Sequence, residues 1–242
     1  MGLVDTLIRQ ATPAPPKVIL YGQPGAGKTT FAASAKALLI DCENGAGAVP
    51  NLARTPYLET WASMRKWLVE LADEPPKELA AVAIDTIDWM IQRIIEHVVI
   101  DLDPKSRGDV TNTLGSAHGG YYKAREIVAN IVHRDLLPML NAIAAHGVPI
   151  ILLAHAVNMK LTTPEGFHLR LAAPDIPEWI APVFIEWSDA VLYAGFGGED
   201  RVMTTVGTNV ILAKNRYSLP ATLPLSWQAL VDALSISKRE MN

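Results

Sequence analysis

One glycine-rich segment has the composition and spacing needed to hold a chain of phosphates. Residues 22–29 match the pattern G-x-x-x-x-G-K-[ST] without a gap. Glycine permits the dihedral angles and the close approach by which backbone amides turn toward a phosphate. Lys28 is expected to reach the β- and γ-phosphates, and the Thr29 hydroxyl is expected to bind magnesium. The predicted ligand is ATP with Mg²⁺, and the predicted binding residues are Gly22, Gln23, Pro24, Gly25, Ala26, Gly27, Lys28, Thr29 and Thr30.

A second candidate magnesium ligand follows an apolar run. Residues 80–84 are apolar and lead directly into Asp85. A buried strand that ends in a carboxylate holds magnesium in many proteins with this phosphate-binding motif. The alternative is that Asp85 only starts a turn, and Thr86 and Asp88 could cap a following helix. The phosphate-binding segment upstream favours the magnesium role.

Hydrolysis of ATP would also need a group that orients the attacking water. Thr86 occupies the position directly after Asp85, where AAA-type ATPases commonly carry a glutamate. Glu43 is the candidate base, because it follows the strand after the phosphate-binding helix. The carboxyl end of that strand is expected to open onto the same crevice as the phosphates. The alternative is a solvated glutamate in a turn.

Strands that alternate with helices must position these groups. Apolar runs predict strands at 17–21, 38–41, 79–84, 149–154, 190–194, 202–206 and 210–213. Apolar residues at helical spacing predict helices at 27–37, 61–71, 88–99, 121–145 and 227–234. Irregular segments are expected at 101–120 and 157–182, and Pro138 should kink the long helix. This order predicts an α/β fold with a mostly parallel central sheet, helices on both faces and antiparallel strands added near the C-terminus.

The composition limits the class of protein further. The 242 residues are 50% hydrophobic, which suits one α/β domain, expected at 17–242 after an N-terminal segment and Pro-rich linker at 1–16. A net charge of −4 gives no general affinity for polyanions. The single cysteine, Cys42, excludes an internal disulfide and favours a reducing cytoplasm. No apolar run reaches the roughly 18 residues that a membrane span requires, so no membrane partner is expected.

Several segments resemble those of one family. Residues 39–43 resemble the segment that carries the catalytic glutamate in RecA-type recombinases, and residues 150–155 resemble the strand that ends in a γ-phosphate-sensing residue. That residue is often glutamine in RecA, whereas it is histidine here. Residues 187–193 resemble a strand of RecA and DnaB-like cores, and residues 214–216 resemble the K-x-R element that enters a neighbouring subunit's ATP site. Over about 17–224, the chain is most similar to the short phage-type RecA-core proteins, the Sak-type single-strand annealing ATPases.

The resemblance implies a RecA-like P-loop NTPase core and names further candidate residues. The catalytic candidates are Glu43, Lys28, His155, Lys214 and Arg216. Lys214 and Arg216 alternate along a strand end and would therefore point to one side, where they could stabilise charge on a neighbour's γ-phosphate. The alternative for this pair is two solvated charges that protect a sheet edge. The alternative for His155 is a histidine satisfied at a strand end.

The resemblance also implies single-stranded DNA as the partner, in recombination or annealing. It implies a homo-oligomer (ring or filament) in which residues 1–16 dock on a neighbour, with a single-strand-binding protein as a further candidate partner. The expected location is the cytoplasm, which is the bacterial host's if a phage encodes the chain. Basic and aromatic groups in the two irregular segments suit DNA binding, unless these are ordinary solvated loops. The DNA-binding candidates are Lys105, Arg107, Tyr121, Tyr122, Lys123, Lys160 and Arg170.

Two other classes of function fit the phosphate-binding motif. One is a binding module in which ATP acts only as a conformational switch and turnover is negligible. The other is a P-loop phosphotransferase for a small molecule. Such an enzyme would be expected to carry a lid with several arginines, whereas residues 103–123 contain only Arg107. The DNA-dependent ATPase is therefore the preferred hypothesis.

Overall fold

Five parallel strands form the centre of the sheet in the computed structural model, which describes residues 14–104, 113–162, 166 and 168–240. Their order across the sheet is β2-β3-β4-β1-β6. The bounds are β1 (Lys17–Gly22), β2 (Leu38–Asp41), β3 (Val82–Asp85), β4 (Ile150–Thr162) and β6 (Ala190–Gly197). Since all five run in the same direction, the residues after β1, β2 and β3 meet at one end of the sheet.

Antiparallel strands extend the sheet beyond β6, as the sequence predicts. The strand β7 (Asp200–Thr204) pairs with β6, and β9 (Thr222–Pro224) pairs with β7. A two-residue strand, β8 (Lys214–Asn215), pairs with the amino end of β6. The strand predicted at 210–213 is wrong, because within this segment only Ile211 makes a bridge, to Ala172. The paired residues lie directly after it.

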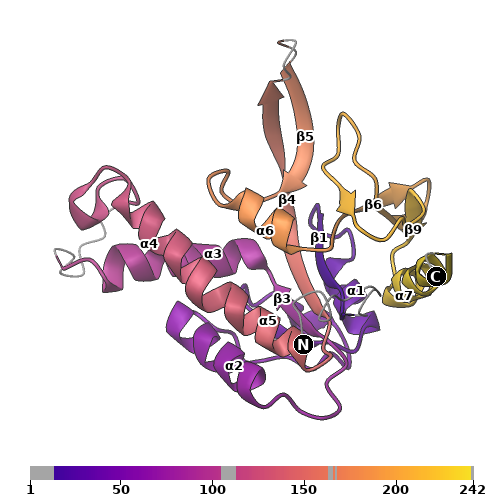
Figure 1. Cartoon of the computed structure of the whole chain (residues 1–242), viewed down its shortest axis with the longest axis horizontal. Helices are drawn as coiled ribbons and strands as arrows, with labels where there is room; N and C mark the ends of the chain where they lie inside the picture. The colour runs from indigo at the N-terminus through magenta and orange to yellow at the C-terminus, as the bar shows by residue number, and fades with distance from the viewer. Residues whose placement is uncertain (1–13, 105–112, 163–165, 167, 241–242) are drawn as a thin grey trace, which may run out of the picture.

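Helices cover both faces of the sheet (Figure 1). The two faces of β1 enter different cores, since Val18 and Leu20 belong to one buried cluster and Ile19 and Tyr21 to the other. A strand that is buried on both faces must be apolar throughout, which explains its sequence. The first cluster includes residues of α1 (Lys28–Ser34) and α7 (Trp227–Glu240). The second includes residues of α2 (Trp61–Asp73), α3 (Ile87–Glu96), α4 (Lys123–Ile131), α5 (Leu137–Ala145) and α6 (Ala181–Trp187).

The long helix predicted at 121–145 is interrupted before Pro138. A π-helical turn, Val132–Leu136, connects α4 to α5. Proline supplies no amide hydrogen to the helical ladder, so a change of hydrogen-bond register at this place is expected. A second π-helical turn, His97–Asp101, continues α3. The expected α/β architecture is therefore confirmed, with a mostly parallel central sheet, helices on both faces and antiparallel strands near the C-terminus.

The irregular segment predicted at 157–182 is wrong. Strand β4 continues to Thr162 and forms an antiparallel hairpin with β5 (His168–Pro174). The hairpin projects from the sheet (Figure 1). Its outer part buries few side chains, so its sequence lacks a continuous apolar run and gives a weak strand signal. None of the helices within the described ranges is long and apolar enough to cross a membrane.

Candidate ATP site and DNA-facing surface

The glycine-rich loop connects the end of β1 to the start of α1. Two of its glycines have positive φ, 78° at Gly25 and 102° at Gly27, a conformation that other residues rarely adopt. A Cβ atom on Gly22 would lie 2.5 Å from the carbonyl oxygen of Ala194, so that position also requires glycine. The motif is therefore explained by backbone geometry as well as by ligand binding.

The buried Lys28 side chain closes this loop. Its Nζ donates to the carbonyl oxygens of Gly22 (3.0 Å) and Gln23 (3.3 Å). Burial lowers the pKa of Lys28, and the carboxylates of Asp85 and Glu43 oppose that shift. A cation held between the loop and two carboxylates suits the binding of anionic phosphate oxygens.

Thr29 and Asp85 meet as the sequence predicts. The Thr29 hydroxyl donates to Asp85 Oδ2 at 2.9 Å. Burial raises the pKa of Asp85 to about 6, and the hydrogen bond from Thr29 opposes that rise. The helix-cap alternative finds no support, since Thr86 precedes α3 without a side-chain cap and Asp88 binds His155 instead.

The donors at this place fit magnesium. A hydroxyl and a buried carboxylate supply the hard oxygen ligands that Mg²⁺ prefers. Within the described residues, no group of three or more histidine, cysteine, aspartate or glutamate side chains could hold a metal ion. Thr29 and Asp85 would therefore hold Mg²⁺ only together with phosphate oxygens of a nucleotide.

Glu43 lies after β2 on a loop that Asp41 holds in place. The Asp41 carboxylate accepts hydrogen bonds from the Asn44 amide (2.7 Å) and from Arg54 (3.0 Å). The Glu43 carboxylate accepts a longer hydrogen bond, 3.4 Å, from the Thr86 hydroxyl. Thr86 therefore occupies the position at which AAA-type ATPases carry their catalytic glutamate. It contacts Glu43, the residue predicted to take over that glutamate's role.

His155 lies beside Glu43 and is oriented by Asp88. Its Nδ1 lies 2.8 Å from Asp88 Oδ2, and its backbone amide donates to the other carboxylate oxygen at 3.1 Å. The other ring nitrogen, Nε2, faces Glu43 Oε2 at 3.7 Å. Asp88 is missing from the predicted site, where it was considered only as a helix cap. Its position one helical turn after Asp85 is the sequence signal that could have found it.

These groups surround one cavity of about 350 Å³. Glu43 comes from just after β2, Asp85 from the end of β3, and His155 from β4 at its last parallel pair with β1. Arg201 of β7 also lines the cavity, and no motif in the sequence indicates it. Gly22, Gln23 and Ala26 do not line the cavity, and Ala26 is buried in the core. The loop contributes Pro24, Gly25, Gly27, Lys28, Thr29 and Thr30.

Lys214 and Arg216 lie at the other end of the sheet. Lys214 pairs with Val191 at the amino end of β6, whereas the phosphate loop follows the carboxyl end of the parallel β1. Lys214 Nζ donates to carbonyl oxygens of Ile185 (2.6 Å) and Ser188 (2.9 Å), at the end of α6. The side chains of Lys214 and Arg216 point to the same side, as their alternate positions in the sequence predict. They point toward the end of α6.

Arg216 has a similar structural contact. It forms an ion pair with Asp189 (3.2 Å) and donates to the Glu186 carbonyl oxygen (2.7 Å). The two cations therefore fasten α6 to the start of β6 instead of standing free at a sheet edge. From this end of the sheet, Lys214 and Arg216 could act only on the nucleotide of a neighbouring subunit. That role stays a prediction.

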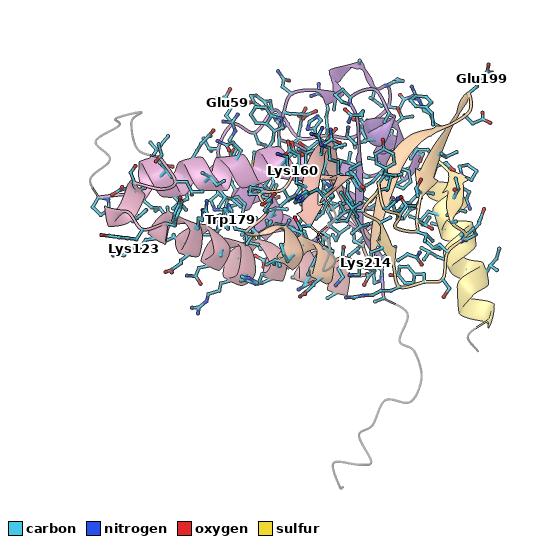
Figure 2. The ribbon with its side chains drawn as sticks, turned by 90° about the horizontal axis from the view of Figure 1, so that it is seen from above. Glu59, Lys123, Lys160, Trp179, Glu199 and Lys214 are labelled. Atoms are coloured by element: carbon cyan, nitrogen blue, oxygen red, sulfur yellow. The ribbon has the colours of Figure 1, made fainter. Side chains whose placement is uncertain are left out.

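The DNA-binding candidates fall into two described groups. Tyr121 and Tyr122 are 93% and 55% exposed. The Arg125 guanidinium lies 4.1 Å from the ring centroid of Tyr122 and 5.7 Å from that of Trp179. In Figure 2, Trp179 lies between Lys123, at the outer end of the helices, and Lys160 of the hairpin. Lys160 and Arg170 are cross-strand partners on that hairpin. The other two candidates, Lys105 and Arg107, lie outside the described residues.

The fold and this cavity define a P-loop nucleotide-binding domain. The chain belongs to the AAA domain family AAA_24, whose model matches residues 14–217. Among solved structures, the chain is similar to that of the RadB recombinase, with 13% sequence identity and a TM-score of 0.46. The alignment covers 89% of this chain and 90% of that one. No functionally curated protein matches the sequence significantly.

Proposed function

We propose that this chain is a magnesium-dependent ATPase of the RecA-like type that acts on single-stranded DNA in phage-type recombination or annealing. The observation that carries the ATPase part is the convergence of Lys28, Thr29, Asp85 and Glu43 on one cavity. The DNA part depends on the exposed aromatic and basic surface and on the resemblance of the sequence to RecA-type recombinases.

Each residue at the cavity has a distinct task in hydrolysis. Lys28 and the loop amides bind the phosphates, while Thr29 and Asp85 would hold Mg²⁺, which would neutralise charge on the phosphate oxygens. Glu43 is placed to accept a hydrogen bond from the attacking water and to orient it. His155 is placed to accept a hydrogen bond from the same water, because its Nε2 faces Glu43.

The DNA surface combines stacking groups with cations. An exposed tyrosine can stack on any base, so it would bind single strands with little sequence preference. Arg125 contacts both Tyr122 and Trp179, which connects the loop at the start of α4 to the segment before α6. A second cavity of about 480 Å³ lies between the hairpin and α6, and Lys160 and Glu178 are among the residues that line it. We infer that a DNA strand runs along this surface.

The proposal extends to assembly. We propose that copies form a ring or filament in the cytoplasm, with residues 1–16 docked on a neighbour and a single-strand-binding protein as a further partner. Arg216 would then release Asp189 and contact the neighbouring subunit's nucleotide. In that case turnover per subunit rises with protein concentration, and Arg216→Ala removes this rise. A concentration dependence that survives the substitution would reject the role in the neighbouring site.

DNA binding is tested by the anisotropy of a fluorescent oligo(dT) in the presence of a non-hydrolysable ATP analogue. Tyr121→Ala should weaken binding by about 1–3 kcal/mol and leave its salt dependence unchanged. Phe196→Ala is the matched control, since Phe196 is 63% exposed but lies near the β6–β7 turn. Equal affinities of the two variants would contradict the stacking role of Tyr121.

The basic candidates Lys105 and Arg107, in the segment that the sequence predicts to be irregular, are tested by salt titration. Replacing Lys105 and Arg107 together by alanine should reduce the slope of log K against log salt by about 1.4, because each phosphate contact on a single strand contributes about 0.7. Lys66→Ala, on the exposed face of α2, is the control. An unchanged slope in the double variant would remove this loop from the DNA surface.

A further inference from the structure

Arg201 lies against the phosphate loop although it comes from the far edge of the sheet. It belongs to β7, where it pairs with Phe196 across the β6–β7 hairpin. A Cβ atom built on Gly27 would lie 3.3 Å from both Cδ and Nη1 of Arg201. The same atom would lie 3.1 Å from a methyl carbon of Leu225. The guanidinium is therefore at the rim of the phosphate-binding cavity, next to an apolar side chain.

The charge of Arg201 is not matched by a carboxylate. Arg54, Arg65, Arg93 and Arg216 each form an ion pair within 4.0 Å. Among the described residues, no carboxylate lies within that distance of Arg201. The backbone here is nonetheless held, because the Leu225 amide donates to the Arg201 carbonyl oxygen at 3.1 Å. An exposed guanidinium on a held backbone at the rim of an anion site is available to a ligand.

The order of the strands places Arg201 opposite the hydrolytic groups. Glu43 follows β2, Asp85 ends β3, and His155 lies within β4 where its parallel pairing with β1 ends. These three strands lie on one side of β1. Arg201 belongs to β7, on the other side of β1 beyond β6. The phosphate loop follows β1 itself and lies between them. The γ-phosphate must lie toward Glu43, so the other end of the bound nucleotide lies toward Arg201.

We propose that Arg201 binds the nucleoside 5′-phosphate end of the nucleotide, away from the phosphate that is hydrolysed. The guanidinium donates charge-assisted hydrogen bonds to α-phosphate oxygens, and Leu225 provides an apolar contact for the nucleoside. This inference depends on the proposed ATP site. It assigns Arg201 to ground-state binding of both ATP and ADP, because both contain this end of the molecule.

The test compares the affinity for ADP with that for a slowly hydrolysed ATP analogue, each carrying a fluorescent label, without DNA. Arg201→Ala should raise both dissociation constants by the same factor, roughly tenfold or more. Arg201→Lys should restore part of the loss. At saturating ATP the turnover number should remain unchanged while KM rises, because Arg201 does not contact the γ-phosphate.

The controls separate binding from folding and from the proposed function. Arg134→Ala removes another exposed arginine, in the π-helical turn between α4 and α5, and should bind both nucleotides like the original chain. The melting temperatures of the Arg201 and Arg134 variants without nucleotide should agree with that of the original chain. If Arg201→Ala weakens ADP binding while the original chain shows no DNA-dependent turnover, this inference holds and the proposed function fails.

Three results would overturn the assignment of Arg201. An unchanged affinity for ADP would show that the guanidinium does not bind this end of the nucleotide. A loss confined to the ATP analogue would place it at the γ-phosphate. A large fall in the turnover number at saturating ATP, with unchanged ADP affinity, would make it a catalytic group.

Discussion

The imidazole of His155 is fixed by both oxygens of the Asp88 carboxylate. One oxygen lies 2.8 Å from Nδ1, and the other accepts the His155 backbone amide at 3.1 Å. An ionised carboxylate only accepts hydrogen bonds, so Nδ1 must carry a proton. This arrangement leaves Nε2 directed at Glu43, 3.7 Å away. Asp88 is therefore a positioning residue for the group that faces the candidate base.

Asp88→Asn should reduce ATP turnover roughly tenfold to hundredfold, with little change in nucleotide affinity. The asparagine amide can donate to Nδ1 and would then favour the wrong tautomer. Asp101→Asn is the matched control, because Asp101 forms a similar pair with His97 (2.7 Å) far from the cavity. The measurement is steady-state turnover of the two variants. Equal turnover in both would contradict the positioning role.

Glu43→Gln should lower the turnover number by about 10²–10⁴-fold and preserve ATP binding. Glutamine keeps the shape of the side chain but is a weak base, so the attacking water loses its acceptor. Glu59→Gln is the control, since Glu59 is exposed on the surface (Figure 2). Single-turnover hydrolysis at saturating ATP separates the chemical step from binding. A turnover number within twofold of the original would favour the ATP-switched binding module.

Asp85→Asn should stabilise the nucleotide-free protein at pH 7.5 in EDTA. The carboxyl has a pKa of about 6 in the folded protein and 3.8 in the reference state. As pH rises through this window, the unfolded chain loses the proton first, so the folded protein loses stability. The variant should gain on the order of 2–3 kcal/mol above pH 6 and nothing below about pH 4. Chemical denaturation at both pH values checks this difference.

The same substitution should weaken magnesium-dependent nucleotide binding, because it removes an anionic oxygen ligand. A gain in stability that is equal at pH 4 and pH 7.5 would contradict the raised pKa of Asp85. In that case the effect would come from packing and not from the titration of the carboxyl.

Lys214→Ala should lower the free energy of unfolding by about 1–3 kcal/mol, because its ammonium group binds partly buried carbonyl oxygens at the end of α6. Its Nζ donates to Ile185, Glu186 and Ser188. Lys160→Ala, on the hairpin, should change the free energy of unfolding by less than about 0.5 kcal/mol. Urea denaturation of both variants provides the comparison. Equal stabilities would mean that Lys214 is free for another role.

The predictable part of the site depends on local sequence and on one rule of topology. The glycine-rich loop is contiguous in the chain, so its motif alone predicts it. Glu43 and Asp85 are distant in sequence, but each follows a strand of a parallel sheet. The carboxyl ends of such strands meet at one edge, which is why these two residues could be placed correctly relative to the loop.

The remaining contacts depend on packing that no motif encodes. The pair of Asp88 and His155 requires α3 to pass beside the middle of β4. Arg201 reaches the loop only through the pairing of an antiparallel edge strand with β6. The β4–β5 hairpin has polar cross-strand partners, such as Lys160 and Arg170, so its sequence resembles that of a loop. Lys214 and Arg216 have backbone partners that become visible only when α6 is in place.

The most direct test of the whole account is ATP turnover with and without single-stranded DNA, with Lys28→Ala as the blank. Lys28 holds the phosphate loop and would bind the phosphates, so its loss should abolish turnover. The account predicts turnover that DNA stimulates and that disappears in the variant. Turnover that is indifferent to DNA, or equal in the original chain and Lys28→Ala, would contradict it.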